Sequence, residues 1–141
     1  MRRSLILIAL SLGLTACAAP SPAQLDIKRV RSEDHLRKEV VLTTINFPQI
    51  QAQLFKHRAH CEVSLDFSLD ENQVHYATVR YGTADKPNLA DQAVFDLTAF
   101  SNGKVQVVGY TYYSQQQFLV DAFLQALSKP EVCAPGITKK E

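Results

Sequence analysis

The sequence lacks several features that would place it in a specialised class. Of its 141 residues only five are Gly and six are Pro, too few for a collagen-like or low-complexity disordered chain. Fifteen Lys and Arg stand against fourteen Asp and Glu. That balance excludes a broad electrostatic footprint for nucleic acid, so we expect no nucleic-acid partner. The length suits one globular domain, because a single core typically occupies about 100 to 200 residues.

Motifs for common catalytic and cofactor chemistry are also missing. The chain has no Gly-x-Ser-x-Gly nucleophile elbow, no phosphate-binding loop and no dinucleotide glycine fingerprint. We therefore predict that the protein is not an enzyme and has no cofactor. His57, His60 and Cys61 form a metal-like cluster, but a structural zinc site needs four ligands. We expect no metal site, and interpret the two histidines as residues on the polar face of a helix.

The amino terminus has the pattern of an export signal. Arg2 and Arg3 precede an apolar run of about ten residues, and this segment ends in Leu14-Thr15-Ala16-Cys17. The run is too short to span a bilayer, which needs about 20 apolar residues. Residues 1–16 are therefore predicted to be a signal peptide that is removed. The alternative is an ordinary signal peptide cut near Ala19, with Cys17 discarded.

Leu14-Thr15-Ala16-Cys17 resembles the lipobox of bacterial lipoproteins. The resemblance implies that the Cys17 thiol receives a diacylglycerol and that the new amino terminus gains a further acyl chain such as palmitate. Three chains would anchor the protein firmly, since two already bind stably. Ala18 stands where inner-membrane lipoproteins of enteric bacteria carry Asp. The resemblance therefore implies an outer-membrane lipoprotein that faces the periplasm.

Behind this signal the chain divides into a leader, a domain and a short tail. Residues 17–38 are predicted to be a lipidated tether and polar leader, because 18–24 are small and Pro-containing and charges of both signs follow. The leader is either solvated and weakly structured or a docking arm for a partner. The domain is expected at 39–135 and a tail at 136–141.

Two cysteines remain after Cys17 is used for lipid. An even pair in an exported protein predicts a disulfide, because the compartment is oxidising. A bridge between Cys61 and Cys133 would close a loop of about 72 residues, which the chain-entropy relation values at about 4 kcal/mol.

Hydrophobic spacing predicts the elements of the domain. Residues 47–60 and 114–129 have helical spacing, with Asn46 before the first helix and a capping box at Ser114 and Gln117 before the second. Strands are predicted at 39–44, 63–69, 74–81, 92–101 and 104–113. The order is β-α-β-β-β-β-α, an α+β fold with an antiparallel sheet and both helices on one face. This order resembles the helix-grip domains of small envelope lipoproteins, including the lipoprotein of the β-barrel assembly machinery, over about residues 38–134.

The register of the last hairpin predicts a candidate interaction face. Asn102-Gly103 favours a two-residue type I′ turn, which sets Leu97 opposite Val108. An apolar set then lies on the face away from the helices: Val79, Val94, Phe100, Val105 and Val107. Such a face marks an interaction site, unless residues 25–38 or a second copy cover it, or the register is displaced by one residue, which would swap the two faces.

These observations predict a membrane-anchored periplasmic lipoprotein that acts as a protein-interaction or envelope-assembly module. Its partners would be the membrane through the lipid anchor and a protein, or a second copy of the chain. The alternative is a lipoprotein that binds a small apolar ligand in a pocket between the helices and the sheet. An open apolar sheet face over a filled core would favour the protein partner.

Overall fold

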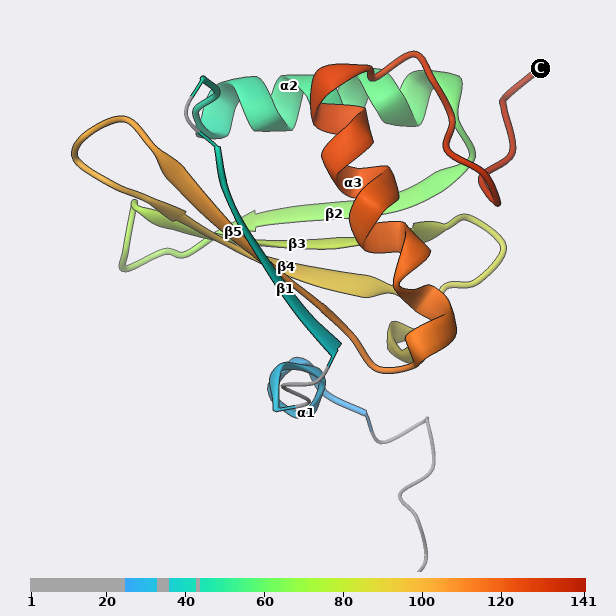
Figure 1. Cartoon of the computed structure of the whole chain (residues 1–141), viewed down its shortest axis with the longest axis horizontal. Coiled ribbons are helices and arrows are strands. Elements are labelled where there is room, and N and C mark those ends of the chain that lie inside the picture. Colours follow the sequence, from blue (N-terminus) through green and yellow to red (C-terminus); the bar gives the residue numbers. More distant parts are fainter. Residues whose placement is uncertain (1–24, 33–35, 43) are drawn as a thin grey trace, which may run out of the picture.

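The computed structural model describes residues 25–32, 36–42 and 44–141. The predicted signal peptide 1–16, the lipidation site Cys17 and the tether residues 18–24 lie outside the described residues. Figure 1 shows a twisted sheet with two long helices, α2 and α3, on one face and a short helix, α1, on the other.

The five strands form one antiparallel sheet in the order β1-β5-β4-β3-β2. Along the chain the elements are α1 (Ile27–Arg31), β1 (Arg37–Leu42), α2 (Phe47–His60), β2 (Val63–Leu69), β3 (Tyr76–Thr83), η3 (Leu89–Asp91), β4 (Ala93–Ala99), β5 (Val105–Thr111), η4 (Ser114–Gln116) and α3 (Phe118–Ser128). The predicted α+β class and the order from the first strand to the last helix are confirmed. The helix α1 was not predicted.

Local sequence explains how α2 begins, but the cap predicted for α3 is absent. The Asn46 side chain accepts a hydrogen bond from the Gln49 N–H, and the Gln49 side chain accepts one from the Asn46 N–H. This reciprocal capping box satisfies two N–H groups that the first turn leaves free. The predicted capping box at Ser114 is wrong, because Ser114 opens the 3₁₀ turn η4 and α3 starts only at Phe118.

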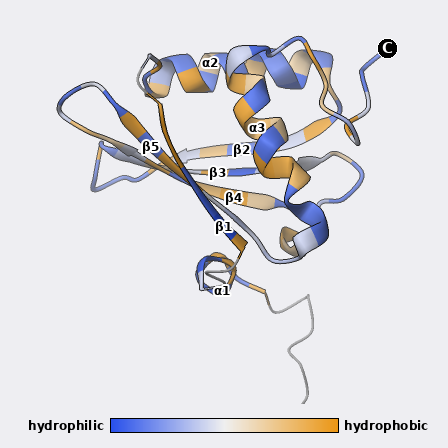
Figure 2. Ribbon diagram, in the orientation of Figure 1, coloured by the Kyte–Doolittle hydropathy of each residue, from blue (hydrophilic) through white to orange (hydrophobic). Residues whose placement is uncertain are grey.

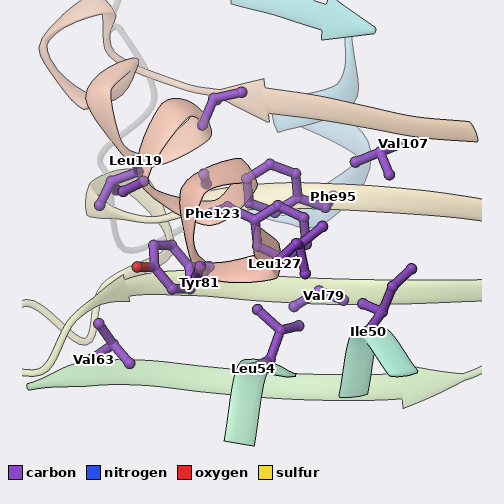
Figure 3. Close-up of a cluster of buried hydrophobic side chains, with 14 of the residues drawn as sticks. Ile50, Leu54, Val63, Val79, Tyr81, Phe95, Val107, Leu119, Phe123 and Leu127 are labelled. Carbon is purple, nitrogen blue, oxygen red and sulfur yellow. The ribbon is translucent and has the colours of Figure 1, made fainter. Parts of the chain in front are cut away.

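The core fills the space between the sheet and the helices α2 and α3 (Figure 3). Phe95 of β4 stacks on Phe123 of α3, with ring centroids 3.8 Å apart. Gly109 of β5 makes room for this pair, because a Cβ there would lie 2.9 Å from the Phe95 ring. Figure 2 shows that α3 is mainly hydrophobic, whereas α2 is mixed and buries one stripe, which includes Ile50 and Leu54.

The folded unit extends beyond residues 39–135 at both ends. On the amino-terminal side β1 begins at Arg37, and Val30 of α1 is fully buried. On the carboxyl-terminal side Ile137 joins the core, and the Glu62 N–H donates to the Thr138 carbonyl at 2.8 Å. The prediction of a solvated, weakly structured leader is therefore wrong for Ile27–Arg31.

The register of the β4–β5 hairpin differs by one residue from the prediction. Leu97 lies opposite Val107, not Val108. The connection is a three-residue loop, closed by a hydrogen bond from the Phe100 N–H to the Lys104 carbonyl at 2.8 Å. Only Gly103 has positive φ, at 79°. A type I′ turn needs positive φ at both central residues, whereas a type I turn followed by one left-handed Gly gives this longer loop.

Candidate interaction surfaces

The displaced register changes where the predicted interaction residues lie. Val79, Val105 and Val107 belong to the core under α2 and α3. Val94 lies on the opposite face but is fully buried, and only Phe100 is exposed. The apolar face predicted from these five residues is therefore wrong, because three of them point to the helix side and a fourth is covered.

The outer face, defined here as the sheet face that carries α1, is held to that helix by one arginine. Arg31 Nε donates to Asp96 Oδ2 at 2.9 Å, and Arg31 Nη2 donates to Thr78 Oγ1 at 3.1 Å. Arg31 Nη2 also contacts Asp96 Oδ1. With Val30 buried beside it, this contact docks α1 on the sheet, so the described part of residues 25–38 lies on this face, as the alternative supposed.

Two hollows of about 640 and 660 Å³ flank Arg31 on the outer face. Ser68 and Thr78 line both of them. The second also contains Asp66 and Arg80, whose Oδ2 and Nη2 atoms are 2.6 Å apart. The charges of Asp66 and Arg80 are therefore already paired, while Lys28 and the apolar side chains of Ile27 and Leu89 also line the second hollow.

Exposed apolar side chains gather at one end of the sheet, which we call the hairpin end. It consists of Leu69, Val74, Tyr76 and Phe100, which are 54%, 76%, 46% and 44% exposed. The first three come from the β2–β3 hairpin and Phe100 from the β4–β5 loop, and Figure 1 shows both hairpins at the same end of the molecule. A hydrogen bond of 2.8 Å from the Ala99 N–H to the His75 carbonyl joins the two hairpins.

The predicted disulfide between Cys61 and Cys133 is confirmed, with Cα atoms 5.6 Å apart. Cys61 ends α2, and Cys133 follows α3. The bridge therefore ties the carboxyl ends of the two helices that cover the core. Such an arrangement constrains the whole β2–α3 segment that lies between the two cysteines.

His57 lies close to this bridge and is buried, so its assignment to a polar helix face is wrong. Its Nδ1 donates to the Pro130 carbonyl and its Nε2 accepts from the Tyr81 hydroxyl, both at 2.9 Å. Burial disfavours the imidazolium and so lowers the pKa of His57. Burial likewise raises the pKa of Tyr81. Both side chains are therefore neutral and hydrogen-bonded within the core.

Within residues 25–32, 36–42 and 44–141, no cluster of three or more His, Cys, Asp or Glu side chains is placed to hold a metal ion. In the same ranges no helix has the length and hydropathy needed to cross a membrane.

Sequence reasoning missed the contact of Arg31 with Asp96 and the exposed side chains of the β2–β3 hairpin. A weak local signal existed for α1: Asp26 caps the helix by accepting from the Arg29 N–H. The spacing of Ile27 and Val30 is also helical. No local signal pointed to Asp96 as the partner of Arg31.

No known protein family matches this chain, and a comparison with curated proteins finds no significant match.

Proposed function

We propose that this chain is a lipid-anchored protein of a bacterial outer membrane, facing the periplasm, whose domain binds a protein partner. The anchor is supported by Leu14-Thr15-Ala16-Cys17, which resembles a lipobox. Export is supported by the bridge between Cys61 and Cys133, because structural disulfides persist in oxidising compartments.

The hairpin end carries the proposal of a protein partner. Single exposed apolar residues are ordinary, but a group of them marks an interaction site. Leu69, Val74, Tyr76 and Phe100 form such a group on two hairpins that are hydrogen-bonded to each other. Two acidic residues, Asp70 and Glu71, and one basic residue, Lys104, flank this group in the sequence. This surface fits a protein with an apolar centre and a net basic rim, such as a subunit of an envelope assembly complex.

The interior favours this proposal over a small apolar ligand. The pocket for such a ligand was predicted between the helices and the sheet, where Leu54, Phe95, Leu97 and Phe123 are almost completely buried. The stacked rings of Phe95 and Phe123 occupy the centre of that space. The two hollows on the outer face lie outside this core, on the other side of the sheet.

Site-specific photo-crosslinking in cells tests the partner. A photoreactive amino acid at Val74 or at Phe100 should yield one and the same crosslinked protein. The control position is Lys86, which is exposed in the loop after β3, at the opposite end of the sheet. Crosslinks of equal yield at Lys86, or none at Val74 and Phe100, would refute binding through the hairpin end.

Labelling with palmitate and membrane fractionation test the anchor. Cys17→Ser should abolish the label and leave the protein unprocessed or soluble, while Cys133→Ala should keep the label. A Cys17→Ser protein that is still processed and membrane-bound would show that the anchor assignment is wrong.

A further inference from the structure

Within the described residues, no strand pairs with the outer edge of β2. The Asp70 N–H donates to the Tyr76 carbonyl at 3.0 Å, and the Ala84 N–H donates to the Glu62 carbonyl at 3.1 Å. Both pairs continue the β2–β3 register, in which backbone groups of alternate residues face the neighbouring strand. The even-numbered residues of β2 therefore bond to β3. The N–H and C=O groups of Leu65, Phe67 and Leu69 point away, and no described strand lies on that side.

This edge lacks the protection that natural sheet edges carry. Edge strands are usually blunted by Lys, Pro, inward-pointing charges or a bulge. The other edge of the sheet, β1, has three consecutive charges in Arg37–Glu39. In contrast, β2 has one charge, Asp66, no Pro and no Lys, and its seven residues pair one to one with β3 without a bulge. The carboxyl-terminal segment pairs only at Cys61 and so leaves β2 itself open.

We propose that β2 pairs antiparallel with β2 of a second copy of this chain, so that two five-stranded sheets become one continuous sheet. This inference rests on the proposed function, since it names a second copy as one partner of the interaction module. Anchoring in a membrane would favour the pairing, because it confines both copies to one surface and raises their effective concentration.

The side chains select one register for this pair. A two-fold axis through Asp66 would set the two Asp66 carboxylates opposite each other, and like charges directly opposite are destabilising. An axis through Phe67 sets Asp66 opposite Ser68 of the second copy and Phe67 opposite Phe67. It also sets Leu65 opposite Leu69, which covers the exposed side chain of Leu69. The register centred on Phe67 is therefore the one that we infer.

Two observations favour a second copy over a foreign strand. The residues Val63–Leu69 have the same alternation of apolar and polar side chains in both directions, so a two-fold axis matches apolar with apolar groups. Asp66 already binds Arg80 and needs no basic residue from a partner, because the Ser68 hydroxyl suffices. The axis also brings the two α2 helices, each with an exposed Phe55, onto the same face of the joined sheet.

Sedimentation equilibrium of the full-length chain in detergent tests the pairing by charge reversal. Ser68→Lys would face Asp66 of the second copy and should strengthen self-association. Ser68→Asp should weaken it by a similar factor. Because symmetry makes each contact twice, each change should be roughly two- to thirty-fold in the dimer dissociation constant. Ser101→Asp, on the β4–β5 loop, is the charge-matched control and should leave the constant unchanged.

Disulfide crosslinking tests the register. In a mixture of an Asp66→Cys chain with a Ser68→Cys chain, the two new thiols should form a crosslinked dimer. Directly opposite residues that do not share hydrogen bonds have Cα atoms about 4.5 Å apart, within the range that a disulfide bridges. Asp66→Cys alone should crosslink poorly, whereas an axis through Asp66 would reverse this result.

The pairing is overturned if the chain is monomeric at all concentrations, or if Ser68→Lys and Ser68→Asp change self-association in the same direction. These outcomes are separate from a failure of the proposed function. A monomeric chain that is lipidated and crosslinks to another protein at Val74 refutes only the β2 pairing. A dimer whose Cys17 carries no lipid refutes only the anchor.

Discussion

Replacing both Cys61 and Cys133 by Ala should lower the free energy of unfolding by about 4 kcal/mol. The two residues are separated by 72 positions. The chain-entropy relation gives a loss of about 15 cal/mol/K for a loop of that size, which is about 4.4 kcal/mol at 25 °C. Typical domains have a total stability of about 5–15 kcal/mol, so the variant should keep roughly 1–11 kcal/mol of it.

Urea denaturation followed by circular dichroism, at pH 7.5 and without reductant, measures this difference. For a domain of this size a loss of 4 kcal/mol lowers the melting temperature by roughly 15–30 °C. Dithiothreitol added to the unmodified protein should reproduce most of the loss. Cys17→Ser is the control and should leave the denaturation midpoint unchanged, because it removes no bridge.

The double substitution also removes two sulfur atoms, one of them from the fully buried Cys61. This adds a small cavity cost, so the loss should not fall below the entropic value. A loss under about 1 kcal/mol would show that the unfolded chain is not restrained by the bridge. Our reasoning about the β2–α3 loop would then be refuted.

Three further predictions follow from the core, from the docked leader and from the buried histidine. Val107→Ala should lower the free energy of unfolding, measured by urea denaturation, by about 2 kcal/mol because Val107 is buried in the core, whereas Gln106→Ala should lower it by under about 0.5 kcal/mol. The opposite ranking would contradict the register. Arg31→Ala should lower the free energy of unfolding by about 1 kcal/mol or less, since the ion pair with Asp96 is about one-third exposed. Limited proteolysis should nevertheless cleave the α1 segment faster in this variant, and unchanged cleavage would contradict docking through Arg31. Because burial lowers the pKa of His57 below 6.5, its contribution to stability should be complete above pH 6.5 and be lost as the pH falls through the lowered value. The denaturation midpoint should therefore decrease as the pH is lowered from 7.5 to 5.5. His57→Gln should make this decrease smaller, whereas the exposed control His75→Gln should leave it unchanged.

Sequence reasoning succeeded where one local pattern decides the structure. The alternation of Val63, Leu65 and Phe67 with polar residues suits a strand with one buried face, and β2 is such a strand. The capped segment after Asn46 became α2. The disulfide followed from the two cysteines that remain once Cys17 is set aside as the predicted lipidation site, without any knowledge of geometry. The strand and the helix depend on residues that are close in sequence, and the disulfide depends only on how many cysteines are available.

The register of β4 and β5 could not be decided in this way. Asn-Gly is compatible with a two-residue loop and with a three-residue loop that ends in a left-handed Gly. Alternation usually removes such an ambiguity, because a shift by one residue exposes the apolar set. Here both faces of the central strands are apolar: Phe95 and Leu97 point to the helices, while Val94 and Val108 are buried on the outer face. A shift by one residue therefore exchanges one apolar set for another.

The helix α1 accounts for the second apolar set. It has only five residues, too few to form alone in water, so it exists through its contacts with the sheet. Its partner Asp96 lies 65 residues after Arg31, and no local pattern could join the two. Because this helix docks on the outer face, a valine such as Val94 is covered by the chain itself. Val94 therefore offers no apolar surface to a partner, whereas the group at the hairpin end, Leu69, Val74, Tyr76 and Phe100, stays exposed.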